Sequence, residues 1–210
     1  MFGGFGKSRD TEGKRSYCQF AQYFGIEPLP DAGCRDPLEL FMRQFGGRSF
    51  GNGLFKVFGD ADLEKWHGIA ASCFPALRGR FKLFGYDWLG RCFAVDLNEA
   101  HENEVLLLEI GTLEILGIGK DILGFANEEI PTMSEACLAS GVYEEWLESN
   151  EPVPPLQCAG YRIPLFLGGE DELSNLEVSD MEVYWDMTDQ LWEAVKDLPE
   201  GTKIGNISFE

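Results

Sequence analysis

Two short motifs in the sequence contain the residue types that phosphate binding and zinc catalysis require. Gly6-Lys7-Ser8 matches the end of a phosphate-binding loop, but the first glycine of that loop would fall on Met1, where no strand can precede it. His101-Glu102 matches the start of a zinc-protease helix, but Val105 stands where the second histidine ligand should be. Since neither motif is complete, the sequence predicts no catalytic residues, no enzyme activity and no cofactor.

The cysteines are the other candidates for nucleophilic or metal chemistry. They are irregularly spaced and form no Cys-x-x-Cys pair, and only His67 and His101 could join them as metal ligands. Without a secretion signal, the default state of such cysteines is a reduced and mostly buried thiol. We therefore expect no metal site. The six are Cys18, Cys34, Cys73, Cys92, Cys137 and Cys158.

The composition predicts a globular protein that does not contact a membrane. The chain has 210 residues, 44% of them hydrophobic and 13% aromatic, which is enough to bury an ordinary core. Its longest apolar stretches, such as Val105-Leu106-Leu107-Leu108, are far shorter than the roughly 20 residues that span a bilayer. The N-terminus lacks the apolar block of a signal peptide, so we expect a cytoplasmic location.

Charge is distributed unevenly along the chain, whose formal net charge is −19. Up to Val95 there are 13 Lys and Arg against 10 Asp and Glu; from Asp96 onward there are 4 against 26. An acidic second half repels nucleic acid and anionic membranes, so we expect neither as its direct partner. The asymmetry favours a basic partner, and the alternative is an acidic surface that only solubilises the protein.

Hydrophobic patterns predict an α+β fold, with an antiparallel meander sheet flanked by helices and a smaller, mostly helical C-terminal domain. The predicted strands follow one another through short connections, which favours a meander over alternating β-α-β units. We place the domain boundary so that residues 1–125 form the first domain and residues 126–210 the second. The predicted strands cover residues 54–58, 81–84, 91–97, 104–110 and 113–118, with a further edge strand at 204–209.

Two helices are predicted in the second domain. Thr132-Met133-Ser134-Glu135 has the pattern of a capping box, so a helix should begin there and bury Met133. Ser179 or Asp180 should cap a last helix. Helical spacing predicts that this last helix buries Met187.

Aromatic residues are interspersed among the carboxylates of the second half, for example Tyr184, Trp185 and Trp192. One interpretation is a surface with aromatic anchors inside an anionic rim, which is the composition of an interface that captures a basic protein. A nuclease is such a protein, because the cleft that binds phosphates is positively charged. The other interpretation places Trp185 in the core and leaves the acids as plain surface.

Longer stretches of the chain resemble known families. Phe45-Gly46-Gly47-Arg48-Ser49-Phe50 and Tyr86-Asp87-Trp88-Leu89-Gly90-Arg91 are similar to the GAD-like domain, and the first is loosely similar to the SMI1/KNR4 immunity superfamily. The tail resembles the C-terminal domain of the immunity proteins that are paired with type VI secretion DNase toxins. The segments that carry this resemblance are 160–169, 175–185 and 198–202.

This resemblance implies a non-enzymatic, cytoplasmic antitoxin that neutralises a cognate basic nuclease by blocking or distorting its active cleft. An enzyme with an unrecognised site, or a regulatory or scaffolding module whose partner is not a toxin, remain the alternatives. The family motifs assign no contact residues, so these are chosen on charge and aromatic character. The predicted partner-binding residues are Glu128, Glu129, Glu170, Asp171, Glu172, Asp180, Trp185 and Asp186, with Asp87 and Trp88 added from the first domain.

Overall fold

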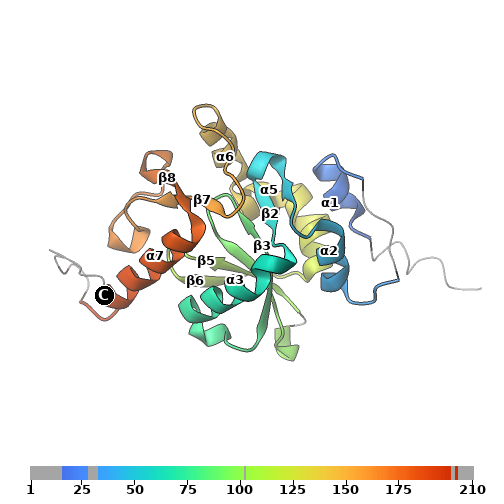
Figure 1. The fold of residues 1–210 in the computed structure, drawn as a ribbon, viewed down its shortest axis with the longest axis horizontal. Coiled ribbons are helices and arrows are strands. Elements are labelled where there is room, and N and C mark those ends of the chain that lie inside the picture. Colours follow the sequence, from blue (N-terminus) through green and yellow to red (C-terminus); the bar gives the residue numbers. More distant parts are fainter. Residues whose placement is uncertain (1–15, 28–32, 102, 200–201, 203–210) are drawn as a thin grey trace, which may run out of the picture.

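A six-stranded antiparallel sheet is the centre of the computed structural model, which describes residues 16–27, 33–101, 103–199 and 202. The strands lie side by side in sequence order, which confirms the predicted meander and the α+β class (Figure 1). The predicted edge strand at 204–209 lies outside the described residues. The six strands are β1 (Ser49–Phe50), β2 (Phe55–Val57), β3 (Phe81–Asp87), β4 (Cys92–Asp96), β5 (Val105–Glu109) and β6 (Glu114–Gly117).

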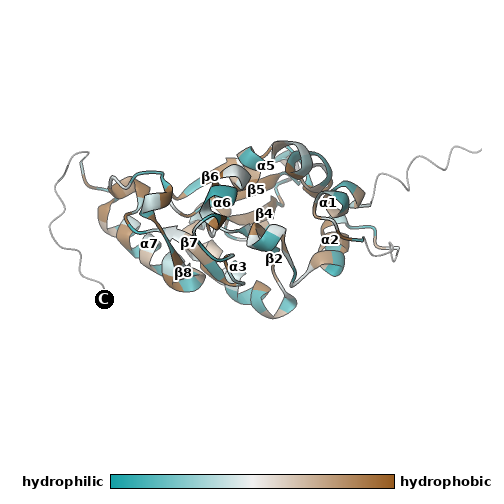
Figure 2. Cartoon of the chain, turned by 90° about the horizontal axis from the view of Figure 1, so that it is seen from above, coloured by the Kyte–Doolittle hydropathy of each residue, from teal (hydrophilic) through white to brown (hydrophobic). Residues whose placement is uncertain are grey.

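Both faces of the sheet are covered by helices, which explains why β4 and β5 are almost continuously apolar (Figure 2). Successive side chains of a strand point to opposite faces. Phe93 and Val95 therefore pack into one core with α1, α2, α4, α5 and α6, whereas Cys92 and Ala94 pack into a second core with α3 and α7. These helices are α1 (Cys18–Tyr23), α2 (Pro37–Phe45), α3 (Asp60–Cys73), α4 (Ile122–Gly124), α5 (Ile130–Leu138), α6 (Ser140–Leu147) and α7 (Met181–Val195). Among the described residues, no helix has both the length and the apolar character needed to cross a bilayer.

The helix predicted from the capping box at Thr132 begins ten residues earlier than expected. Asp121 caps it by accepting a hydrogen bond from the Gly124 amide at 2.8 Å, and a π-helical turn at Phe125–Glu129 joins α4 to α5. Thr132 lies inside this helical segment, where its hydroxyl donates to the Glu128 carbonyl at 2.6 Å. Met133 is 51% exposed, so the prediction that it is buried is wrong.

A second, two-stranded sheet connects the C-terminal helix to the main sheet. It consists of β7 (Gln157–Tyr161) and β8 (Leu176–Asp180), which pair antiparallel. The Ala159 amide of β7 donates to the Trp88 carbonyl at 2.7 Å and holds this hairpin against the turn after β3. Asp180 then caps α7 by accepting from the amides of Glu182 and Val183 at 3.0 and 3.1 Å, which confirms the predicted start of the last helix.

The buried face of α7 differs from the predicted one. Met181, Tyr184, Trp185 and Thr188 are buried, a spacing of three, four and seven residues that defines one side of a helix. Met187 lies on the other side and is 45% exposed, so the prediction that it is buried is wrong. The helix therefore presents an outer side with both apolar and acidic residues.

Candidate functional site

Three of the predicted partner-binding residues are buried and are not available to a partner. Trp185 donates from Nε1 to the Gly90 carbonyl at 2.8 Å, and Trp88 donates from Nε1 to the Leu138 carbonyl at 3.0 Å. Asp87 is buried beside them. Because both indoles and the carboxylate hold elements of the core together, their predicted role as partner contacts does not fit the structure. Trp185 follows the second interpretation of the sequence, in which it belongs to the core.

The acidic residues of the loop between β7 and β8 are exposed, and the loop itself is held in place. Asp171 accepts a hydrogen bond from the Tyr161 hydroxyl at 2.5 Å, and the Asn175 side-chain amide donates to the Glu170 carbonyl at 2.9 Å. Glu172 is exposed as well. These side chains could meet a partner without reordering of the loop.

The pair predicted at the start of the second domain is less available. Glu128 is exposed but already forms an ion pair with Lys120 at 2.7 Å, and Glu129 is only partly exposed. A partner cation would have to displace Lys120 from Glu128. We therefore consider Glu128 and Glu129 weaker candidates for partner contacts than the acidic residues of α7.

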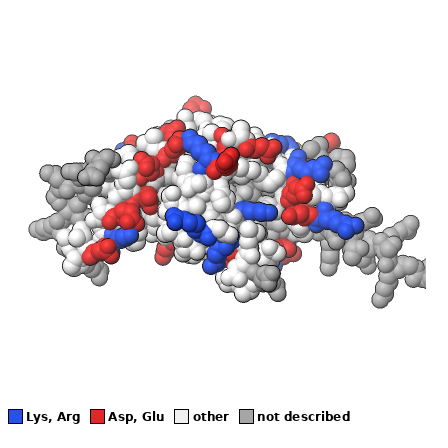
Figure 3. Space-filling model, turned by 60° about the horizontal axis from the view of Figure 1, so that its bottom comes forward, with Lys and Arg blue, Asp and Glu red and all other residues white. Residues whose placement is uncertain are grey.

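The outer side of α7 is the surface where several of these features meet. A groove of about 510 Å³ runs between α7 and α3, and it is called the α3–α7 groove below. Figure 3 shows acidic side chains gathered at the end of this face that α7 forms, whereas Lys and Arg are spread over the face. The residues that line the groove are Ile69, Ser72 and Cys73 of α3 and Glu182, Val183, Asp186 and Asp189 of α7.

The electrostatics of this groove favour a cation. Partial burial raises the pKa of Asp189, and the neighbouring carboxylates of Glu193 and Asp186 raise it further, while Lys196 opposes them. Burial also raises the pKa of the Cys73 thiol to about 12, with Asp189 and Asp186 adding to the effect. The thiol is therefore protonated at neutral pH and is a poor nucleophile. The groove is suited to binding and not to nucleophilic chemistry.

Of the residues that line this groove, only Asp186 is among the partner-binding residues predicted from sequence. Asp189 and Val183 were not predicted, because helical spacing placed Met187 in the core. That placement assigned the wrong side of the helix to the buried face. The available signal was the spacing of Met181, Tyr184 and Trp185, which with Thr188 form a single buried face.

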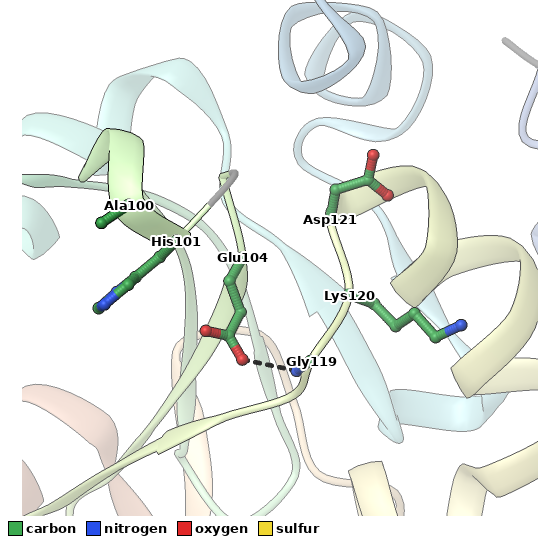
Figure 4. Close-up of a pocket in the computed structure, with 6 residues that line it drawn as sticks. All are labelled: Ala100, His101, Glu104, Gly119, Lys120 and Asp121. Carbon is green, nitrogen blue, oxygen red and sulfur yellow. Dashed lines mark hydrogen bonds between the residues drawn. The ribbon is translucent and has the colours of Figure 1, made fainter.

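A second hollow, of about 440 Å³, lies where the loop before β5 meets the loop after β6 (Figure 4). Its polar groups have structural partners: Glu104 accepts from the Gly119 amide at 2.6 Å, Asp121 caps α4, and Lys120 binds Glu128. His101 and Lys120 point away from each other in Figure 4. The hollow therefore does not join these groups into an acid–base pair.

Acid is expected to destabilise the protein through Asp96, which lies next to this hollow. Burial alone would raise the pKa of this carboxyl, but hydrogen bonds from Arg80, the Asn98 amide and His101 outweigh burial and lower the pKa to about 2. An unfolded chain has the ordinary pKa of 3.8. The stabilisation, about 2 kcal/mol, is present above about pH 4 and is lost as the pH falls towards about 2.

Urea unfolding of the wild type and of Asp96→Asn at a series of pH values checks this expectation. The difference in unfolding free energy between the two proteins should shrink as the pH falls below about 4. A difference that stays constant down to about pH 2.5 would contradict it.

Comparison with known proteins relates residues 126–192 of the chain to a known class of protein. That class is the immunity proteins of type VI secretion, non-enzymatic inhibitors that bind a cognate toxin. The particular family is described as T6SS immunity protein Tdi1, C-terminal, and its model matches residues 126–192. The match includes β7, β8 and α7 as far as Trp192, and it confirms the resemblance of the tail. It does not reach residues 45–91, so the resemblance to the GAD-like domain and to the SMI1/KNR4 superfamily stays a prediction.

Solved structures with a similar fold include the following one. The crystal structure of Atu4351 from Agrobacterium tumefaciens matches with a TM-score of 0.55 and 13% sequence identity, covering 83% of this chain and 88% of that chain. At this identity the likeness shows the fold alone. No curated protein matches the chain significantly in sequence.

Proposed function

We propose that the protein is a type VI secretion immunity protein that neutralises a cognate nuclease, a DNase, by binding it and blocking or distorting its active cleft. The observation that carries this proposal is the family match over residues 126–192, the segment that contains the outer side of α7. Because a DNase acts on DNA inside the cell, the antitoxin would meet it in the cytoplasm.

Charge complementarity supports a nuclease as the target. A cleft that binds the phosphates of DNA is positively charged, and the second half of this chain carries 26 acidic residues against 4 basic ones. Opposite charges increase the rate at which two proteins meet. They also oppose contact between this protein and DNA itself.

Charge alone does not give the affinity that an antitoxin needs. Picomolar to nanomolar binding corresponds to about −12 to −16 kcal/mol, and exposed ion pairs contribute only fractions of a kcal/mol each. Interfaces of this strength depend on a few well-packed anchors. The contact surface is therefore expected to include apolar residues next to the acids.

Co-expression with the toxin encoded by the neighbouring gene tests the proposal. We expect full rescue of growth, co-purification of the two proteins, and loss of plasmid cleavage when the purified protein is added in equimolar amount to the toxin. The binding should weaken as the salt concentration rises. A toxin that still kills the cell and does not co-purify with the protein would rule the proposal out.

A further inference from the structure

Helix α7 has a second apolar stripe that is separate from its buried face. Val183 and Met187 are four residues apart, so they lie above one another on the outer side of the helix, and they are 53% and 45% exposed. Together with the partly buried Ile69 of α3, Val183 gives the α3–α7 groove an apolar wall. In the part of the chain that the structure describes, these two α7 side chains are not covered.

Carboxylates lie beside this apolar stripe, on the side that faces the groove. Asp186 is held by a hydrogen bond from the Gln190 side-chain amide at 2.9 Å, and Glu182 pairs with Lys65 at the edge of the groove. Neither Asp186 nor Asp189 forms an ion pair with a described residue. The two acids lie three residues apart on the same helix, where like charges destabilise each other. A cation placed between them would remove that repulsion.

From this arrangement we infer that the α3–α7 groove receives a basic amphipathic segment of the cognate toxin. An apolar side chain of that segment packs against Val183 and Ile69 in the groove and against Met187 beside it. An adjacent lysine or arginine reaches Asp186 and Asp189. This inference rests on the proposed function and names the surface through which it operates. Binding of an amphipathic helix in an apolar groove is a common mode of peptide recognition. The bound helix contacts the groove through apolar residues spaced three or four positions apart.

Two other occupants fit the groove less well. A nucleic acid or an anionic lipid would bring phosphates next to Glu182, Asp186 and Asp189, and like charges repel. A second copy of this chain, joined by the same face, would set the same carboxylates against each other across a two-fold axis. The carboxylates of Glu182, Asp186 and Asp189 therefore favour a cationic protein segment over these two occupants.

The charged part of the site is tested with Asp186→Asn/Asp189→Asn, measured for toxin binding by calorimetry or surface plasmon resonance. The matched control is Glu144→Gln/Glu145→Gln, which removes the same charge from exposed positions of α6. We expect the groove variant to bind at least tenfold more weakly and with a smaller salt dependence, and the control to stay within about twofold of the wild type.

The apolar part is tested with Val183→Lys, and Val178→Lys on β8 is the control because Val178 is also a half-exposed valine of the second half. The groove variant should lose at least tenfold in affinity, because a lysine there both fills the apolar wall and pairs with the acids that the toxin needs. All four variants change exposed or partly exposed side chains, so their thermal unfolding midpoints should stay within a few degrees of the wild type.

The outcomes separate the two proposals. If the wild type binds and neutralises the toxin but both groove variants behave like their controls, the groove is not the contact surface and the immunity function stands. If the wild type does not bind the toxin at all, the proposed function is wrong and the inference is wrong with it.

Discussion

Asp87→Ala is expected to lower the free energy of unfolding by about 3–5 kcal/mol, because it leaves a buried guanidinium without its partner. Asp87 is fully buried and accepts from Arg91 Nε at 2.6 Å and from the amides of Leu89 and Arg91 at 3.0 Å. The only other carboxylate that forms an ion pair with Arg91 in the described structure is Glu109, at 3.6 Å. Urea unfolding followed by tryptophan fluorescence measures the loss.

A double variant separates the charge effect from the loss of the turn. Asp87→Ala/Arg91→Met removes both charges of this pair, so part of the lost stability should return. The remaining cost has two sources: the amides of Leu89 and Arg91 lose their acceptor, and Glu109 loses its ion pair with Arg91. If Asp87→Ala lowers the free energy of unfolding by less than about 1 kcal/mol, the Arg91 guanidinium is stabilised by solvent or by Glu109 instead, which would contradict the prediction.

Trp185→Ala should destabilise the protein by a similar amount, about 3–5 kcal/mol, because it opens a cavity between α7 and α3. The Trp185 ring contacts the rings of Trp66 and Phe74 edge-on, each at 5.9 Å between centroids. The milder Trp185→Phe keeps most of the apolar volume and loses the hydrogen bond to the Gly90 carbonyl. It should cost about 1–2 kcal/mol in urea unfolding.

Trp192→Ala is the matched control on the same helix, since Trp192 is only partly buried and packs mainly on Phe166. It should cost clearly less than Trp185→Ala. Equal costs for the two tryptophans would mean that α7 is not fixed to the sheet by Trp185.

The same unfolding curves test the predicted division into domains at residues 125 and 126. The boundary lies inside the continuous helical segment of residues 122–138, and each of the two cores contains residues from both sides of it. The family match, by contrast, begins at residue 126. One transition seen by all probes would indicate a single cooperative unit, and separate loss of α7 would support two domains.

Five of the six strands of the main sheet, β2 to β6, were predictable from sequence because each is short, largely apolar and bounded by glycine or polar residues. The two-residue strand β1 was not predicted. β2 to β6 all lie within the predicted segments or extend them by a few residues. The start of the helical segment at Asp121 was not predictable in the same way. Thr132 to Glu135 satisfies the local rule for a capping box, and only tertiary packing of Ile122 and Phe125 into the core extends the helix past it.

The candidate site was predictable in its charge and not in its geometry. Composition identified the acidic half, and Asp186 was selected from it. Local sequence did not show that Trp88, in the turn after β3, would be covered by β7, by the end of α5 and by α6. Exposure of a turn residue depends on segments far away in the chain, and Trp88 contacts residues at least fifty positions later in the sequence.

The two sides of α7 are under different structural constraints. Met181, Tyr184, Trp185 and Thr188 are fixed by the core, while the residues between them face outwards and contribute little to stability. The outward residues can therefore change type or charge during evolution without endangering the scaffold. Under the proposed function, a change of toxin partner would require substitutions on only one side of this helix, while the architecture stays the same.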